Sequence, residues 1–241
     1  MDQLITYYDK DSERFWRAES GFTGRDLDVY PLTHGLQGDL IEYGCGSGSL
    51  LLNLALEPRF TSACGVDISS QALAKIHSAW NNMSEDNIRS KIALYQPVND
   101  TLPFLEDSFF DLLICVATLE HVLNPYLVLD ELYRLARPGA VLIASVPNYA
   151  YLKHRIQLLF GVQPRTGTDE PVEKWRTEGW DGMHLHTFTR SSFNVLLNDC
   201  GWRPLLWRGA GTRFNSLGLG PLRRNYPGLW SGELITVCKK L

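Results

Sequence analysis

The sequence lacks several features that would place the protein in a membrane, outside the cell or on nucleic acid. None of its apolar runs approaches the ~20 residues that a membrane-spanning helix needs, and its first residues, MDQLITYYDKD, are unlike a secretory signal. It has no Lys/Arg-rich run and a net charge of −4, which argues against binding long nucleic acid through phosphates. Its five cysteines include no C-x-x-C pair and fit buried free thiols better than disulfides. These absences predict a cytoplasmic protein with no stable membrane anchoring and no nucleic-acid partner.

Strand-like and helix-like segments alternate through the first 147 of the 241 residues, and the 44% hydrophobic content is enough for a substantial core. Strands are expected at 39–43, 61–66, 91–95, 110–116 and 140–146, and helices at 49–57, 69–82 and 124–135. A further helix is expected at 191–200, with final strands at 202–207 and 233–238. The alternation with short connections predicts an α/β fold, in which a parallel sheet has helices on both faces.

Three stretches fall outside this alternation, and no linker separates them from it. We therefore predict a single domain over 1–241. Its expected parts are an N-terminal cap (1–38), a cofactor-binding core (39–147), a substrate lid insertion (148–189) and a C-terminal part of the sheet with a loop insertion (190–241). Within the lid, YLKHRIQLLF reads as a basic amphipathic helix, which could alternatively lie on a membrane surface.

The clearest motif is a glycine-rich loop, Gly44-Cys45-Gly46-Ser47-Gly48, between the first strand and the first helix. Glycines at such a turn let a ligand approach the backbone closely. Asp67, at the end of the next strand and 19 residues after Gly48, can accept hydrogen bonds from both hydroxyls of a ribose. Together they predict a nucleoside-containing cofactor, with a plain tight turn as the alternative. Ser49 stands where the nicotinamide-dinucleotide fingerprint requires Gly or Ala, which disfavours that cofactor.

Four segments resemble, in order and spacing, the motifs of class I S-adenosylmethionine-dependent methyltransferases. They are LIEYGCGSG, CGVDIS, LPFLEDSFFDLLICVATLEHVLNP and RLARPGAVLIASVPN, which together cover residues 39–148. The resemblance implies a Rossmann-like, seven-stranded and mostly parallel sheet whose last strand is antiparallel. It also implies S-adenosyl-L-methionine as the methyl donor and S-adenosyl-L-homocysteine as the product.

The resemblance further implies which residues surround the cofactor. They are Glu42, Gly44, Cys45, Gly46, Gly48, Asp67, Ile68, Asn99, Asp100 and Ala117. Glu42 is expected to orient the loop and reach the methionine amino group, Asp67 to bind the ribose, and Ala117 to lie under the methionine end. Ile68 either contacts the adenine or packs in the core. Val98 stands where the family often has an acid for the adenine amino group, so Asp100, Asn99 or the backbone is expected there; Asp100 alternatively forms an Asx turn.

Two histidines are the expected catalytic residues, because a hydroxyl acceptor benefits from a general base and histidine titrates near neutrality. His121 follows the fourth strand, and its alternative role is packing or capping the next helix. His184 begins HLHTFT, which resembles the HLrfFT segment of methyltransferases found near polysaccharide and sugar biosynthesis. It either reaches the acceptor or fixes the lid by a hydrogen bond. His186 has a weaker claim.

A metal site is not expected. The pair Glu120-His121 is similar to the ubiquinone-biosynthesis O-methyltransferases, in which an E-x-x-E-H run binds a divalent metal. Ala117 stands at the first acid of that run, so the sequence predicts no metal ion. Aromatic residues of the cap and lid form either an acceptor pocket or a small core of their own. They are Tyr7, Tyr8, Tyr149, Tyr151, Trp175 and Trp180.

The sequence therefore predicts an S-adenosylmethionine-dependent methyltransferase with a small-molecule acceptor, and oxygen as the favoured accepting atom. A sugar or a phenol fits, while a carboxylate or a peptide terminus stays open, as does the oligomeric state. Methyltransferases acting on nucleic-acid amino groups carry [DN]-P-P-[YF] after the fourth strand, where this chain has ATLEH. The alternatives are an NAD-dependent oxidoreductase and an S-adenosylmethionine-binding module without catalysis.

Overall fold

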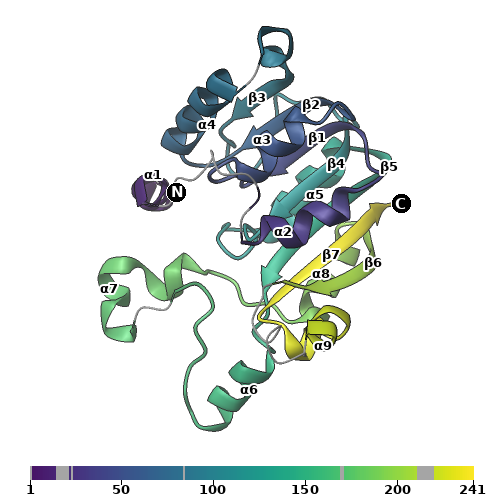
Figure 1. Ribbon diagram of the computed structural model, residues 1–241. Coiled ribbons are helices and arrows are strands. Elements are labelled where there is room, and N and C mark those ends of the chain that lie inside the picture. Colours follow the sequence, from purple (N-terminus) through teal and green to yellow (C-terminus); the bar gives the residue numbers. More distant parts are fainter. Residues whose placement is uncertain (1, 15–21, 23, 84, 169–170, 211–219) are drawn as a thin grey trace.

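A seven-stranded sheet forms the centre of the computed structural model, which describes residues 2–14, 22, 24–83, 85–168, 171–210 and 220–241 (Figure 1). The strands are β1 (Gly38–Tyr43), β2 (Phe60–Val66), β3 (Ile92–Tyr95), β4 (Phe110–Val116), β5 (Ala136–Pro147), β6 (Trp202–Gly209) and β7 (Glu233–Lys240). They lie in the order β3-β2-β1-β4-β5-β7-β6. The first five pair in parallel, and β7 runs antiparallel to both β5 and β6. The expected fold class is confirmed.

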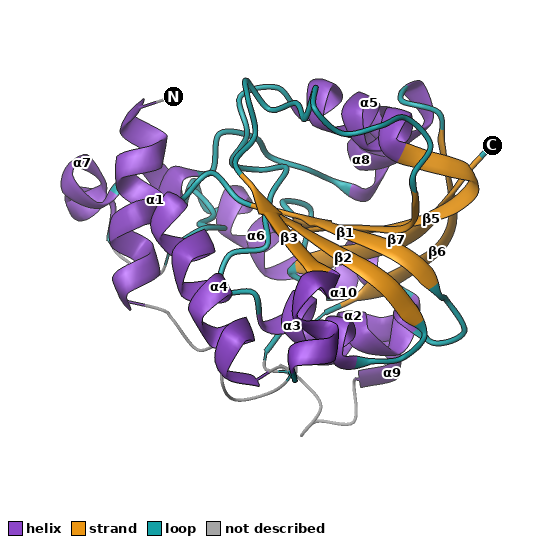
Figure 2. Ribbon diagram, turned by 90° about the horizontal axis from the view of Figure 1, so that it is seen from above, coloured by secondary structure: helices purple, strands orange, loops and turns teal. Residues whose placement is uncertain are grey.

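Helices cover both faces of this sheet (Figure 2). The larger ones are α1 (Asp2–Arg14), α3 (Ser49–Leu56), α4 (Ser70–Met83), α5 (Pro125–Leu135), α6 (Leu152–Leu159) and α8 (Arg190–Asp199). Shorter turns of helix are α2 (Asp26–Val29), α7 (Trp175–Glu178), α9 (Gly220–Asn225) and α10 (Pro227–Trp230). There are also 3-10 turns at Tyr30–Thr33, Asp86–Lys91, Val172–Lys174 and Trp180–Met183. Helices α5 and α8 lie on one face, and α2, α3 and α4 on the other.

The middle strands are buried on both faces, and this explains their nearly continuous apolar sequences. Successive side chains of a strand point to opposite faces. Accordingly, Ile41 and Leu113 pack in the cluster that includes α5 and α8, while Leu40 and Leu112 pack in the cluster that includes α3 and α4. All four side chains are fully buried. This packing holds the carboxyl ends of β1, β2 and β4 together at one edge of the sheet.

The fifth strand begins earlier than the sequence indicated. The sequence predicts a strand that starts at residue 140, after a helix that ends at residue 135. In the structure, α5 ends at Leu135, but β5 begins at Ala136, which pairs with Phe110 across a register shift. The carbonyl of Leu135 accepts a hydrogen bond from the Phe109 amide at 2.8 Å. The chain therefore begins to pair with the neighbouring strand directly after the helix ends.

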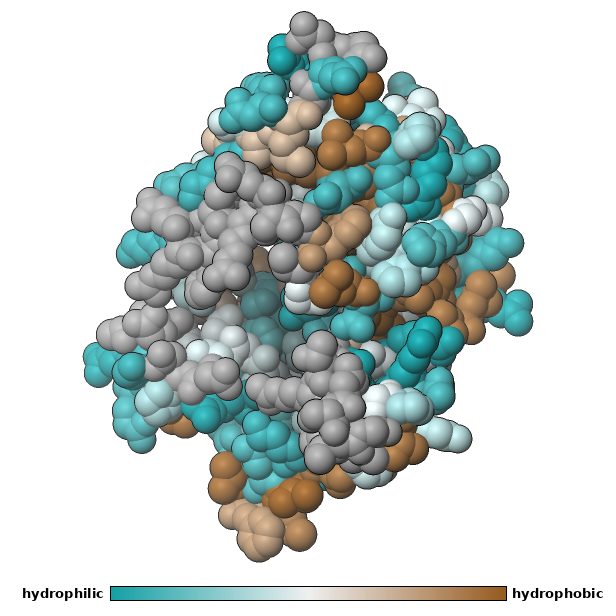
Figure 3. Space-filling view, viewed as in Figure 1, coloured by the Kyte–Doolittle hydropathy of each residue, from teal (hydrophilic) through white to brown (hydrophobic). Residues whose placement is uncertain are grey.

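Residues 148–189 leave the sheet after β5 and return before α8. The two ends of the segment are tied together, because Asn148 bridges Phe188 and the amide of Tyr149 donates to the carbonyl of Phe188. Apolar side chains of α6 and the residue after it are exposed at the foot of the molecule in Figure 3. They are Ile156, Leu158, Leu159 and Phe160. Across the described residues, every helix is too short or too polar to cross a membrane.

Candidate active site

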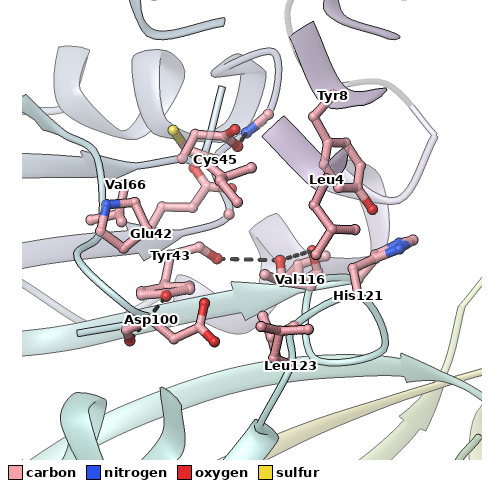
Figure 4. A pocket seen from close by; sticks show the side chains of 18 of the residues that line it. Leu4, Tyr8, Glu42, Tyr43, Cys45, Val66, Asp100, Val116, His121 and Leu123 are labelled. Atoms are coloured by element: carbon pink, nitrogen blue, oxygen red, sulfur yellow. Dashed lines mark hydrogen bonds between the residues drawn. The ribbon is translucent and has the colours of Figure 1, made fainter. Parts of the chain in front are cut away.

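A cavity of about 390 Å³ opens where β1, β2 and β4 end (Figure 4). It brings together most of the site residues expected from the sequence. Those that line it are Glu42, Gly44, Cys45, Gly46, Asp67, Ile68, Asp100, Ala117 and His121. Gly48, Asn99 and His184 are not among its lining residues. Burial raises the pKa of the Cys45 thiol well above its usual range, so this cysteine is an inert part of the wall.

The glycine loop is hydrogen-bonded to the end of β2. The amides of Gly44 and Cys45 both donate to the carbonyl of Val66, at 2.7 and 2.9 Å. Gly44 has φ of +77° and lies against Thr118, where an added Cβ would be 2.1 Å from the hydroxyl oxygen. Gly46 has φ of +51° and no atom within 4 Å of the position of a Cβ. Gly44 is therefore required by the packing against Thr118, whereas Gly46 leaves free space within the cavity.

Alanine substitutions at these two glycines should separate the two requirements. Gly44→Ala combines a left-handed backbone with a clash, and we expect a loss of about 2–5 kcal/mol of unfolding free energy. Gly46→Ala meets only the backbone cost, about 1–2 kcal/mol. Urea denaturation of both variants measures the difference. Equal losses would show that Thr118 moves aside and that the close approach is not a constraint.

Asp67 is presented to the cavity by backbone hydrogen bonds. Its Oδ2 accepts from the amide of Gly46 at 2.8 Å, and its Oδ1 from the amide of Ser69 at 2.9 Å. Burial raises the pKa of this carboxyl, and the two amides oppose that effect. Each carboxylate oxygen keeps a second lone pair. The side chain is thus fixed in an orientation that can accept hydrogen bonds from two neighbouring hydroxyls of a ligand.

Glu42 is a buried carboxyl with an incomplete set of partners. Its Oε2 has no hydrogen-bond partner among the described residues, and only 6% of the residue's surface is exposed. Burial, and to a smaller extent the nearby Asp26, raise the pKa of Glu42 well above its usual range. An unsatisfied buried carboxyl is costly, so this position suits a ligand that brings a hydrogen-bond donor or a positive charge.

Two neighbouring residues in left-handed conformations decide which polar side chain turns inward after β3. Asn99 (φ +50°) and Asp100 (φ +64°) form the turn between Val98 and Thr101. Asp100 is buried and lines the cavity, whereas Asn99 is exposed. Ala117 at the end of β4 has φ of +49° and donates its amide to Ser145. Such conformations at non-glycine residues cluster at functional sites.

The structure brings the two candidate histidines together. Their rings meet edge to face, with centroids 4.6 Å apart. The Nδ1 of His121 lies 3.1 Å from the carbonyl of Met183, which can only accept, so this nitrogen carries the proton. The Nδ1 of His184 lies 2.8 Å from the hydroxyl of Thr166, whose proton is donated to Asp181. Nδ1 of His184 therefore donates as well, and the Nε2 of each ring keeps a free lone pair.

Burial sets the charge of this histidine pair and of the adjacent glutamate. It lowers the pKa of His121 to about 4, with a smaller effect from His184, and it lowers the pKa of His184 to about 4. Both imidazoles are therefore neutral at pH 7. Glu120 is 1% exposed, and neither of its carboxylate oxygens has a hydrogen-bond partner among the described residues. Burial raises the pKa of Glu120 to about 8.

The N-terminal residues contribute more of the cavity wall than the sequence indicated. Leu4, Tyr8 and Arg25 line the cavity, and Tyr8 packs edge-on against His121 at 5.6 Å. The hydroxyl of Ser69 donates to Asp9 at 2.6 Å, which ties α1 to the start of α4. The only sequence signal was the aromatic pair of Tyr7 and Tyr8. Tyr8 alone of the aromatic candidates lines the cavity; Tyr7, Tyr149, Tyr151, Trp175 and Trp180 do not.

Comparisons with known proteins identify a family and several relatives. The methyltransferase domain family profile matches residues 10–206. The chain is 31% identical over 117 residues to a ubiquinone biosynthesis O-methyltransferase from Psychrobacter arcticus (47% of this chain, 43% of that protein). It is 30% identical over 146 residues to the protein of the same name from Hahella chejuensis (57% of this chain, 58% of that protein). The chain spans about half the length of the curated relatives it matches.

A solved structure supports the fold. The crystal structure of an S-adenosylmethionine-dependent methyltransferase from Aquifex aeolicus superposes with a TM-score of 0.63 at 13% identity. The superposition covers 97% of this chain and 98% of that one. At this identity the likeness concerns the arrangement of the sheet and its helices.

Proposed function

Since the chain belongs to the methyltransferase domain family, as a class I S-adenosylmethionine-dependent methyltransferase, we propose that it transfers a methyl group to an oxygen atom of a small molecule. The observation that carries the proposal is the pair of neutral histidines beside the cavity that holds Asp67 and Glu42. Neutral imidazoles promote the loss of a hydroxyl proton, which an oxygen acceptor requires and an uncharged amine does not. The O-methyltransferase relatives support the same reaction.

The cavity fits S-adenosylmethionine at three points. The free space over Gly46 lets the ligand reach the loop backbone, Asp67 is oriented to accept from the ribose hydroxyls, and Glu42 offers its unpartnered oxygen to the methionine ammonium. The bound donor supplies a sulfonium methyl, whose carbon–sulfur bond breaks as the new oxygen–carbon bond forms and whose electron pair stays on sulfur. The protein's part is to align the two reactants and exclude water.

The acceptor end of the cavity is bounded by the proposed cap. Leu4 and Tyr8 of α1 lie over His121 and make this part of the wall apolar and aromatic, while Arg25 also lines the cavity (Figure 4). The proposed lid, residues 148–189, brings the ring of His184 against that of His121. An apolar aromatic wall beside groups that promote deprotonation suits a phenolic hydroxyl better than a free sugar. A phenol is accordingly the acceptor class that we propose.

Binding and product analysis test the proposal. Calorimetry should show binding of S-adenosylmethionine and S-adenosylhomocysteine and no binding of NAD, since Ser49 departs from the dinucleotide fingerprint. Mass spectrometry of reactions with matched phenols and anilines should then show methyl ethers as products. NAD binding without either sulfur compound would overturn the cofactor assignment, and methylated amines alone would overturn the choice of oxygen.

A further inference from the structure

A cluster of metal-ligating side chains lies beside the cavity and joins two distant segments. Glu120 and His121 follow β4, whereas His184 lies in the insertion between β5 and α8. One ligand atom of each residue lies within 4.8 Å of the other two. We propose that these three residues bind one divalent transition-metal cation, and that the cation holds the acceptor oxygen.

The free atoms of the two histidines fit this role. Each ring uses Nδ1 to donate a hydrogen bond, His121 to the carbonyl of Met183 and His184 to Thr166. Metal-bound histidines in proteins show the same arrangement, because the outer hydrogen bond fixes the ring and leaves the other nitrogen as the ligand. For His184 the outer chain extends further, since Thr166 donates in turn to Asp181, which is buried.

Glu120 completes the ligand set with a side chain that makes no hydrogen bond among the described residues. Its carboxylate is buried and neither oxygen has a hydrogen-bond partner, although its own carbonyl accepts from the amides of Leu185 and His186. Those two bonds hold the His184 segment against the turn that carries Glu120. The neighbouring positive charge is Arg25, which is paired with Glu233 at 2.5 Å. One carboxyl group without a hydrogen-bond partner among the described residues therefore lies within reach of two imidazoles.

The donor set selects among cations. Two imidazoles and one carboxylate suit zinc, manganese, iron or cobalt better than magnesium or calcium, which prefer oxygen ligands. Ligands held at ~2.0–2.2 Å from one ion are at most ~4.4 Å apart, so the cluster needs to close by only a few tenths of an ångström. The sequence predicted no metal because Ala117 replaces an acid. His184 supplies a third ligand that no local motif contains.

Three protein ligands leave positions open for the acceptor. This role, though not the binding itself, rests on the proposed methyl transfer to oxygen. A cation held by Glu120, His121 and His184 would lower the pKa of an acceptor hydroxyl, which would then lose its proton to water. The oxygen of that hydroxyl then forms the bond to the methyl carbon, while the electron pair of the broken bond remains on sulfur.

Metal binding by the full-length protein tests the site without any turnover. The protein is stripped with a chelator, dialysed and titrated with Co²⁺, and the visible absorption of bound cobalt is followed. We expect one Co²⁺ per chain, displaced by Zn²⁺. His184→Ala and Glu120→Gln should each weaken binding at least tenfold. Thr166→Val, which removes the hydroxyl that accepts from His184 and donates to Asp181, should weaken it about 10–100-fold.

His186→Gln is the matched control. This histidine lies two residues from His184 and donates to the carbonyl of Val122 at 2.9 Å, so glutamine keeps a donor there and Co²⁺ binding should not change. Absence of stoichiometric Co²⁺ binding, or binding unaffected by His184→Ala, would overturn the site. Calorimetry with S-adenosylmethionine on the same metal-free protein separates the two proposals. If the donor binds and cobalt does not, the metal site alone fails; if cobalt binds and the donor does not, the proposed function fails.

Discussion

Replacement of His121 by alanine should lower turnover by about 10²–10⁴-fold, the usual contribution of assisted proton removal. Its ring lies against His184 and under Tyr8, at the end of the cavity formed after β4, whereas Asp67 lies at the end of β2. The affinity for S-adenosylmethionine should therefore change little. Initial rates at saturating donor and acceptor, with calorimetry of the donor, measure the two quantities separately.

The double variant with His184→Ala shows whether the histidines act together. If both are needed for one step, the double variant should be scarcely slower than either single variant, because residues that act as a unit are not additive. His186→Gln again serves as the control, with turnover close to that of the unchanged protein. Normal turnover in His121→Ala would remove the histidine pair from the mechanism and leave the acidity of the acceptor as the explanation.

Asp67→Ala should weaken S-adenosylmethionine binding by roughly tenfold to a hundredfold, because a hydrogen bond to a charged group contributes about 1.5–3 kcal/mol. The carboxylate is held by the amides of Gly46 and Ser69, so its orientation is settled before the ligand arrives. The dissociation constant from calorimetry is the readout. An unchanged constant would show that the ribose lies elsewhere.

The same two amides make a stability control necessary. Losing the carboxylate leaves the Gly46 and Ser69 amides without this acceptor, so Asp67→Ala also loosens the loop. Asp67→Asn keeps one oxygen acceptor and nearly the same shape. If the alanine variant loses affinity while melting at the temperature of the asparagine variant, the loss belongs to the ligand contact. Asp130→Ala, an exposed aspartate on α5, controls for a general effect of removing an acid.

The parts of the site that follow from the sequence are those built from short stretches of chain. The strand, the glycine loop and Asp67 lie within 30 residues, and their order dictates that they meet at one edge of the parallel sheet. The same reasoning could not separate Asn99 from Asp100. Two consecutive left-handed residues determine which side chain turns inward, and neither is a glycine that would have signalled the turn.

Contacts between segments that are far apart in the chain could not be predicted from the sequence. His184 reaches His121 across 63 positions because Leu185 and His186 donate to the carbonyl of Glu120, a pairing that leaves no periodic pattern in either segment. Arg25 enters the site by its ion pair with Glu233, more than 200 residues later. The motif predicted Gly48 as a cofactor residue. In the structure it does not line the cavity, and an added Cβ would lie 2.7 Å from the side chain of Ile76.

The two buried carboxyl groups with free oxygens, Glu42 and Glu120, have a consequence for the amount of protein in the cell. Each carboxyl group destabilises the folded chain until a ligand supplies a hydrogen-bond donor or a positive charge. Binding then stabilises the fold, by about 2.7 kcal/mol when the ligand is present at 100 times its dissociation constant. Proteases act on opened chains, so methyl donor bound beside Glu42 and a cation bound by Glu120 would each lengthen the lifetime of the protein.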